Sequence, residues 1–234
     1  AMVVQDKDPD AEVWQGRRVG AEAALSVFSL DEAFELSELN EALLETLLGH
    51  DNLYFALGEN KQADALVLDA LQALREAPKA SLAPYSMHDT RPMLHEMRVF
   101  KSACEVAVMK TAGRISAAAH KRAMQFVKPG CYEYHLEAEL HHSFAMQGAR
   151  TPAYSTIVGS GENGCILHYT ENSAQIKDGD LVLVDAGCEY QGYAADITRT
   201  FPANGTFSKP QRDIYEWVLK AQEAVLTTLG PGST

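Results

Sequence analysis

The stretch LVLVDAGCEYQGYAADITRT, residues 181–200, places two aspartates inside runs of apolar and β-favouring residues. Such runs predict two short strands, and the EYQG sequence between them suits a four-residue hairpin loop that ends at Gly192. A hairpin without a bulge then sets Asp185 directly opposite Asp196. Cross-strand neighbours have Cβ atoms about 4.5–5.5 Å apart, so we expect both carboxylates on one face of the sheet.

Two carboxylates in that position repel each other. With an effective dielectric constant near 20, the repulsion is ~3–4 kcal/mol at ~5 Å, which is a large share of a domain's stability. A shared proton or a divalent cation would relieve it, and oxygen ligands favour ions such as Mg²⁺ or Mn²⁺. The alternative is a bulge that leaves Asp185 in a turn, with Asp196 capped by backbone or paired with Arg199.

Two aromatic side chains are further candidates. His168, in CILHYTEN, follows the glycine-rich VGSGENG, where glycines let the backbone approach a ligand closely. The alternative for His168 is an ordinary core or surface histidine. GSGENG is neither a Walker lysine loop nor a dinucleotide turn followed by a helix, so it does not indicate phosphate binding. Trp14, in EVWQGRR, either packs locally or contacts a partner.

Composition narrows the class of protein. A net charge of −12 over 234 residues argues against a nucleic-acid partner. The four cysteines are widely spaced without a CxxC pair, which favours reduced thiols over a zinc cluster or a disulfide scaffold. No run approaches the ~18 apolar residues of a membrane span, and the N-terminus lacks a signal-peptide pattern. We therefore expect a soluble cytoplasmic protein.

The order of elements predicts a mixed α/β (α+β) fold. Strand-like and helical patterns alternate in the N-terminal part, as in an α/β module, and Ser37 is a plausible N-cap. Residues 79–98 carry two prolines and little periodicity, which indicates a linker. Ser102 and Glu105 form a capping box for a long helix. Helices are expected at about 39–48, 61–77, 102–127, 132–148 and 209–229.

Three long stretches resemble a known family: RPMLHEMRVFKS (91–102), TIVGSGENGCILHYTEN (156–172) and DGDLVLVDAGCEYQGYAADITRTFPANGTFS (178–208). They closely resemble the bacterial Xaa-Pro aminopeptidases, also called aminopeptidase P. The resemblance implies part of a creatinase-like N-terminal α/β domain over residues 1–88. It implies the N-terminal half of a pita-bread peptidase domain over residues 89–234. The implied reaction releases the N-terminal residue from peptides that have proline in second position.

The resemblance also implies roles for individual residues. Asp185 and Asp196 map onto ligands of two manganese ions, with Asp196 bridging both. His168 maps onto a catalytic, substrate-binding histidine. Trp14 falls in a motif whose tryptophan reaches toward a neighbouring subunit's active site, which implies a homo-oligomer. Thr198 is expected to form a hydrogen bond to the metal ligands without contacting the metal itself.

The implied mechanism is hydrolysis of the peptide by a hydroxide that bridges two metal ions. The family pattern has a further metal-binding histidine and two glutamates downstream, which this sequence lacks. We therefore expect the chain to be an interior piece of a longer polypeptide that binds manganese poorly alone. Alternatives are a prolidase-like dipeptidase, a relative of methionine aminopeptidase, or a non-catalytic peptide-binding or assembly fragment.

Overall fold

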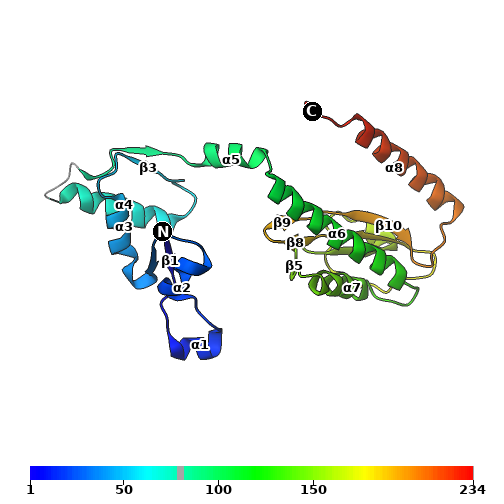
Figure 1. Ribbon diagram of the computed structural model, residues 1–234. Helices are drawn as coiled ribbons and strands as arrows, with labels where there is room; N and C mark the ends of the chain where they lie inside the picture. The colour runs from blue at the N-terminus through cyan, green and yellow to red at the C-terminus, as the bar shows by residue number, and fades with distance from the viewer. Residues whose placement is uncertain (78–81, 234) are drawn as a thin grey trace. The chain divides into compact units, whose positions relative to one another are not determined.

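The structure is a computed structural model that describes residues 1–77 and 82–233. The chain divides into two compact units, Ala1–Phe100 and Lys101–Thr234 (Figure 1). The domain boundary expected from the sequence falls earlier, after residue 88.

The expected linker, residues 79–98, contains more regular structure than its composition suggests. Residues 79–81 lie outside the described part, but strand β4 (Ser86–His88) and helix α5 (Arg91–Val99) follow. Pro92 lies in the first turn of α5, where its missing N–H costs no helical hydrogen bond. The interpretation of this stretch as aperiodic was therefore wrong over its second half.

The first unit alternates strands and helices, as predicted. Strand β1 (Met2–Val4) pairs in parallel with β2 (Ala33–Glu35), and β3 (Asn52–Tyr54) pairs in parallel with β4. Buried leucines of two helices supply much of its core. Its helices before α5 are α1 (Pro9–Gln15), α2 (Gly20–Val27), η1 (Leu36–Glu38), α3 (Leu39–Leu47) and α4 (Lys61–Glu76).

One predicted cap in this unit was wrong. Ser37 does not cap α3, because it lies inside the 3₁₀ turn η1. The capping box is made instead by Glu35, whose side chain accepts from the backbone of Glu38, and by Glu38, whose carboxylate accepts from the Glu35 N–H at 2.9 Å. An acidic side chain takes the place expected for a hydroxyl.

The second unit packs two helices on short antiparallel strands (Figure 1). One sheet has the order β10-β7-β6 and the other the order β5-β8-β9. The helices are α6 (Ala103–Phe126), α7 (Glu133–Met146), η3 (Gly161–Cys165) and α8 (Lys209–Thr228). The strands are β5 (Thr151–Pro152), β6 (Ile157–Ser160), β7 (Leu181–Asp185), β8 (Cys188–Tyr190), β9 (Tyr193–Ala194) and β10 (Thr198–Pro202).

The core of this unit explains why β7 is held firmly. Alanines at 112, 119 and 123 of α6 are fully buried, and their small side chains let the helix approach its neighbours closely. Leu136 and Leu140 of α7 and Val182 and Val184 of β7 are fully buried in the same cluster. Because alternate residues of β7 face this core, Asp185 at its end lies on the opposite face.

The helix limits of this unit agree closely with the sequence. The predicted capping box of α6 is present, with Ser102 Oγ accepting from the Glu105 N–H and the Glu105 carboxylate accepting from the Ser102 N–H. Helix α8 begins after Ser208 and has no buried residue. No helix within the described residues is both long enough and apolar enough to cross a bilayer.

The hairpin at the centre of the unit has a different register from the one predicted. Asp185 lies opposite Thr198, and Tyr190 lies opposite Tyr193. The loop contains only Gln191 and Gly192, with φ of 50° and 84°, as the favoured two-residue hairpin turns require. The expected four-residue loop and the direct pairing of Asp185 with Asp196 were both wrong, by two residues of register.

Candidate metal and substrate site

Asp185 and Asp196 meet at a tyrosine instead of facing each other across the strands. The Tyr154 hydroxyl lies 2.6 Å from Oδ1 of Asp185 and 3.1 Å from Oδ1 of Asp196. Asp185 ends β7, Asp196 lies between β9 and β10, and Tyr154 follows β5. A phenol has one hydrogen to donate, so it satisfies one carboxylate fully only at the expense of the other.

The electrostatics keep Tyr154 a neutral donor. Burial is the largest cause that raises the pKa of Tyr154, followed by its hydrogen bond to Asp185 and the negative charges of Asp185 and Asp196. Asp185 is half-buried and Asp196 is exposed, so water screens part of their repulsion. The pair nonetheless keeps two negative charges around a single shared hydrogen.

A close backbone contact brings the Asp196 segment to the end of β7. A Cβ atom added to Gly187 would lie 1.7 Å from the carbonyl oxygen of Ala195. Ladder hydrogen bonds continue on both sides of this point, from the Ala186 N–H to Ile197 O at 3.1 Å and from the Ala195 N–H to Cys188 O at 2.9 Å. Glycine at 187 is therefore a packing requirement of the site.

A buried histidine forms a hydrogen bond with the backbone that follows Asp185. His120 of α6 is 2% exposed, and its Nε2 lies 2.9 Å from the carbonyl oxygen of Ala186, next to Asp185. Burial lowers the pKa of His120, which favours a neutral imidazole that donates from Nε2. In the described part of the chain, His120 Nδ1 has no hydrogen-bond partner.

The donor set of the aspartate pair fits part of a divalent-cation site. Two carboxylates and a phenol offer hard oxygen atoms, the ligands preferred by Mg²⁺, Mn²⁺ and similar ions. Within residues 1–77 and 82–233, no group of three or more His, Cys, Asp or Glu side chains is arranged to hold a metal. The pair therefore offers two carboxylates, fewer than a complete set of metal ligands.

The other predicted site residues lie in three different places. Thr198 is exposed at the start of β10, directly opposite Asp185. His168 is exposed in the segment between η3 and β7 and adopts a positive φ of 56°. Trp14 is 88% exposed on α1, in the first unit. The structure thus places Thr198 opposite Asp185, whereas among the described residues no hydrogen bond or ion pair joins His168 to the aspartate pair.

Sequence reasoning missed the residues that hold these elements in place. Tyr154 lies 31 positions before Asp185, and nothing in the spacing links the two. Glu133 and Asn172, both buried, hold the segment that carries His168. Buried polar residues of this kind need hydrogen-bond partners, but their burial is visible only once the strands and helices are packed.

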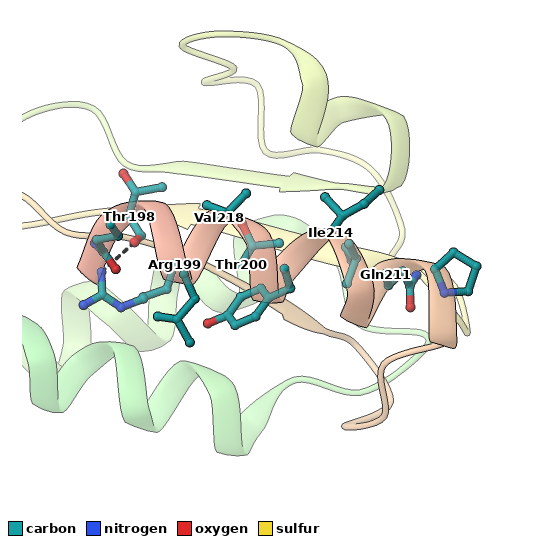
Figure 2. A pocket seen from close by; sticks show the side chains of 11 residues that line it. Thr198, Arg199, Thr200, Gln211, Ile214 and Val218 are labelled. Carbon is teal, nitrogen blue, oxygen red and sulfur yellow. Dashed lines mark hydrogen bonds between the residues drawn. The ribbon is translucent and has the colours of Figure 1, made fainter. Parts of the chain in front are cut away.

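A cavity of about 630 Å³ lies between β10 and α8. Ile214 and Val218 of α8 face it, together with Thr198, Arg199 and Thr200 of β10 (Figure 2). Its lining includes no carboxylate. The cavity therefore offers no acidic ligand of the kind that the aspartate pair provides, although Thr198 borders it.

The sequence is similar to known protein families and to curated proteins. The sequence profile described as metallopeptidase family M24 matches residues 107–234, and the profile described as aminopeptidase P, N-terminal domain, matches residues 1–54. The chain is 54% identical over 229 residues to the Xaa-Pro aminopeptidase of Escherichia coli (strain K12), covering 97% of the chain and 52% of that protein. It is 44% identical over 233 residues to the Xaa-Pro aminopeptidase of Haemophilus influenzae, again covering 52% of the relative.

Solved structures give the same result. Aminopeptidase P from E. coli in its low-pH form superimposes with a TM-score of 0.93 at 53% identity, covering 99% of this chain and 53% of the other. Proline aminopeptidase P II from Yersinia pestis gives a TM-score of 0.90 at 53% identity, covering 98% and 53%. The chain spans about half the length of the curated relatives it matches.

Proposed function

The chain belongs to metallopeptidase family M24, and we propose that it provides part of the active site of an aminopeptidase. The proposed reaction releases the first residue from peptides with proline in second position, the specificity carried in the names of its relatives from E. coli and H. influenzae. The observation that carries the proposal is the shared hydrogen bond of Asp185 and Asp196 to Tyr154. Two carboxylates drawn to one hydroxyl are arranged to accept a cation between them.

A metallopeptidase requires a divalent metal, and we propose that the metal here is manganese, with two ions per complete site. Asp185 and Asp196 would hold it, with Asp196 contacting both ions. The chemistry that a bound divalent cation supplies is Lewis acidity, which polarises a carbonyl and makes water a better nucleophile at neutral pH. The remaining ligands lie outside these 234 residues in the proposed complete protein.

Tyr154 acts on the aspartates in this proposal. A phenol is protonated near neutral pH, and the raised pKa of Tyr154 reinforces this, so Tyr154 donates to Asp185 and orients that carboxylate. The hydroxyl of Thr198 is proposed to orient the same carboxylate, which its position opposite Asp185 supports. Ligands held by a second layer of hydrogen bonds bind metals more tightly than free ones.

His168 is the proposed substrate-binding and catalytic side chain. It is exposed, and its backbone is held in the left-handed region. An imidazole N–H can donate to the carbonyl oxygen of the bond before proline as negative charge develops there. This interaction matters for an Xaa-Pro bond, because the proline nitrogen has no N–H of its own to be recognised.

The proposal also covers the role of Trp14 and the location of the protein in the cell. We propose that the exposed Trp14 contacts substrate in a neighbouring copy of a homo-oligomer, which its 88% exposure leaves it free to do. The widely spaced cysteines support a cytoplasmic location, because reduced thiols are typical there. Peptides are the proposed partners, and the net charge of −12 argues against nucleic acid.

The test is made on the complete protein that carries this sequence. Release of alanine from Ala-Pro-Pro is measured with manganese and after chelation, with Ala-Ala-Ala as the matched control. The proposal predicts metal-dependent cleavage of Ala-Pro-Pro and much slower cleavage of the control. Cleavage only of the dipeptide Ala-Pro would favour a dipeptidase, and no cleavage of any peptide would favour a binding fragment.

A further inference from the structure

Both ends of the segment that carries His168 donate hydrogen bonds to a single carboxylate. Glu133, the first residue of α7, has no exposed surface. Its Oε1 accepts from the Ser160 N–H at 2.7 Å and the Ser160 hydroxyl at 2.8 Å. Its Oε2 accepts from the Ala174 N–H at 2.9 Å. Because Ser160 precedes this segment and Ala174 follows it, Glu133 closes residues 161–173 into a loop.

Two more donors come from inside the loop. The Asn163 amide donates to Glu133 Oε1 at 3.2 Å, and the Tyr169 hydroxyl donates to Oε2 at 2.8 Å. The backbone N–H of Glu133 also donates to the carbonyl oxygen of Ala174 at 3.0 Å. One residue of α7 thus holds both ends of the loop and two points within it.

Asn172 fastens the second half of the loop to β6. It is 2% exposed, and its Oδ1 accepts from the Val158 N–H at 2.8 Å. Its amide donates to the carbonyl oxygen of Thr156 at 2.8 Å and to the Glu137 carboxylate at 3.0 Å. Asn172, which follows the His168–Tyr169 pair, is therefore tied to β6 by a buried hydrogen bond and to α7 through Glu137.

The backbone of the loop shows why such fastening is needed. His168 and Asn172 have φ of 56° and 47°, the left-handed region that residues with a side chain rarely adopt. Backbone strain of this kind persists only where the surroundings impose it. Leu167, next to His168, is 86% exposed, so packing of the loop tip does not impose it. The hydrogen bonds at the base of the loop are the contacts that hold its backbone.

The donors around Glu133 require a carboxylate. All five are neutral N–H or O–H groups. Burial is the largest single effect and raises the pKa of Glu133, but the hydrogen bonds from Ser160, Ala174 and Asn163 together bring it below its usual value. A glutamine would place its NH₂ group against either the Ser160 N–H or the Ala174 N–H. A hydroxyl can turn to accept, but a backbone N–H cannot. One end of the loop would lose its partner in either orientation.

We propose that Glu133 is a positioning residue that fixes the loop 161–173 so that His168 is presented to substrate in one orientation. The inference rests on the proposed role of His168. Glu133 acts through the loop and does not touch the reacting atoms. Its effect on catalysis therefore disappears once His168 has been removed.

The first experiment measures the loop itself in the chain and needs no activity. Amide hydrogen exchange of Ser160 and Ala174 is followed by NMR in the wild type, in Glu133→Gln and in the control Glu139→Gln. Glu139 lies on the same helix in an exposed ion pair with Arg122. We expect exchange at Ser160 or Ala174 to rise about tenfold or more in Glu133→Gln, with Val182 and Val184 of β7 unchanged. Unchanged exchange, or an equal rise at every amide, would overturn the proposal.

A milder variant covers the case in which Glu133→Gln does not fold. Tyr169→Phe removes one of the five donors and leaves both backbone N–H groups paired with Glu133. It should accelerate exchange at Ala174 by a smaller factor, without effect on β7. Exchange identical to that of the wild type would count against the loop acting as one unit.

The second experiment is a double-mutant cycle in the complete protein that carries this sequence. Glu133→Gln alone should lower kcat/KM for Ala-Pro-Pro by about 10- to 100-fold, as expected for a misplaced group. Added to His168→Ala, it should change kcat/KM by less than about threefold, because the two act as a unit. Fully additive losses would overturn the positioning role. If the wild type cleaves no Xaa-Pro peptide, the proposed function fails. The exchange experiment still tests whether Glu133 holds the loop.

Discussion

Asp185 and Asp196 are joined by one phenol: the Tyr154 hydroxyl lies 2.6 Å from the first carboxylate and 3.1 Å from the second. They come together because the backbone at Gly187 passes against Ala195 and because Tyr154 lies between them. One hydroxyl hydrogen cannot satisfy two carboxylates, so a bound cation would stabilise the pair further.

Removing the shared hydroxyl should destabilise the fold, because the two aspartates then repel each other without a common donor. Tyr154→Phe in metal-free protein is expected to lower the free energy of unfolding by about 1.5–3 kcal/mol at pH 7, because hydrogen bonds to charged groups stabilise by that order. Added manganese should recover part of the loss. Urea unfolding with and without the ion provides the measurement, and Tyr134→Phe, an exposed phenol of α7, is the control. A Tyr154→Phe protein as stable as the wild type would contradict the shared-donor account.

Gly187 should tolerate no side chain. A Cβ atom there would lie 1.7 Å from Ala195 O, so Gly187→Ala must separate two paired backbone segments and should destabilise by about 3 kcal/mol or more. Gly113 of α6 is the matched control, because a Cβ atom added there meets nothing within 4 Å. Gly113→Ala should stabilise by about 0.5–1 kcal/mol. Thermal unfolding of the two variants should move in opposite directions, and a mild effect at 187 would refute the close contact.

The contact between Glu105 and Tyr193 should give a defined pH dependence. The hydrogen bond from the Tyr193 hydroxyl, at 2.6 Å, and those from Ser102 lower the pKa of Glu105 to about 2. A carboxyl whose folded pKa lies below its unfolded value of 4.5 contributes stability above that value and loses it as pH falls. The stability difference between wild type and Glu105→Gln should therefore be constant above pH 4.5 and shrink between pH 4.5 and 2. NMR titration of the Glu105 carboxyl checks it, and a midpoint near 4.5 would contradict the contact.

Helices were more predictable than the site. Ser102 with Glu105 marks a helix start by local hydrogen bonding, and the structure confirms it; the last helix also begins at residue 209, as expected. The α5 helix was missed because Pro92 looked like part of a linker, although proline is tolerated in a first helical turn.

The geometry of the site depended on information that is not local. Both Gln191 and Gly192 adopt positive φ, which shortens the loop to two residues and moves Asp185 opposite Thr198. Asp185 and Asp196 still lie close enough to share the Tyr154 hydroxyl, but no sequence pattern indicated Tyr154 or Glu133. Their roles arise from contacts across 31 and 27 positions, which only the packed fold brings together.

The measurement that tests the central claim most directly is a manganese titration followed by isothermal calorimetry. The wild-type chain is compared with Asp185→Asn, Asp196→Asn and the control Asp213→Asn, an exposed carboxylate of α8. We predict weak, saturable binding in the wild type and in Asp213→Asn, and its loss in either site variant, because one carboxylate is too few to hold the ion. Identical titration curves for all four proteins would contradict a cation shared by Asp185 and Asp196.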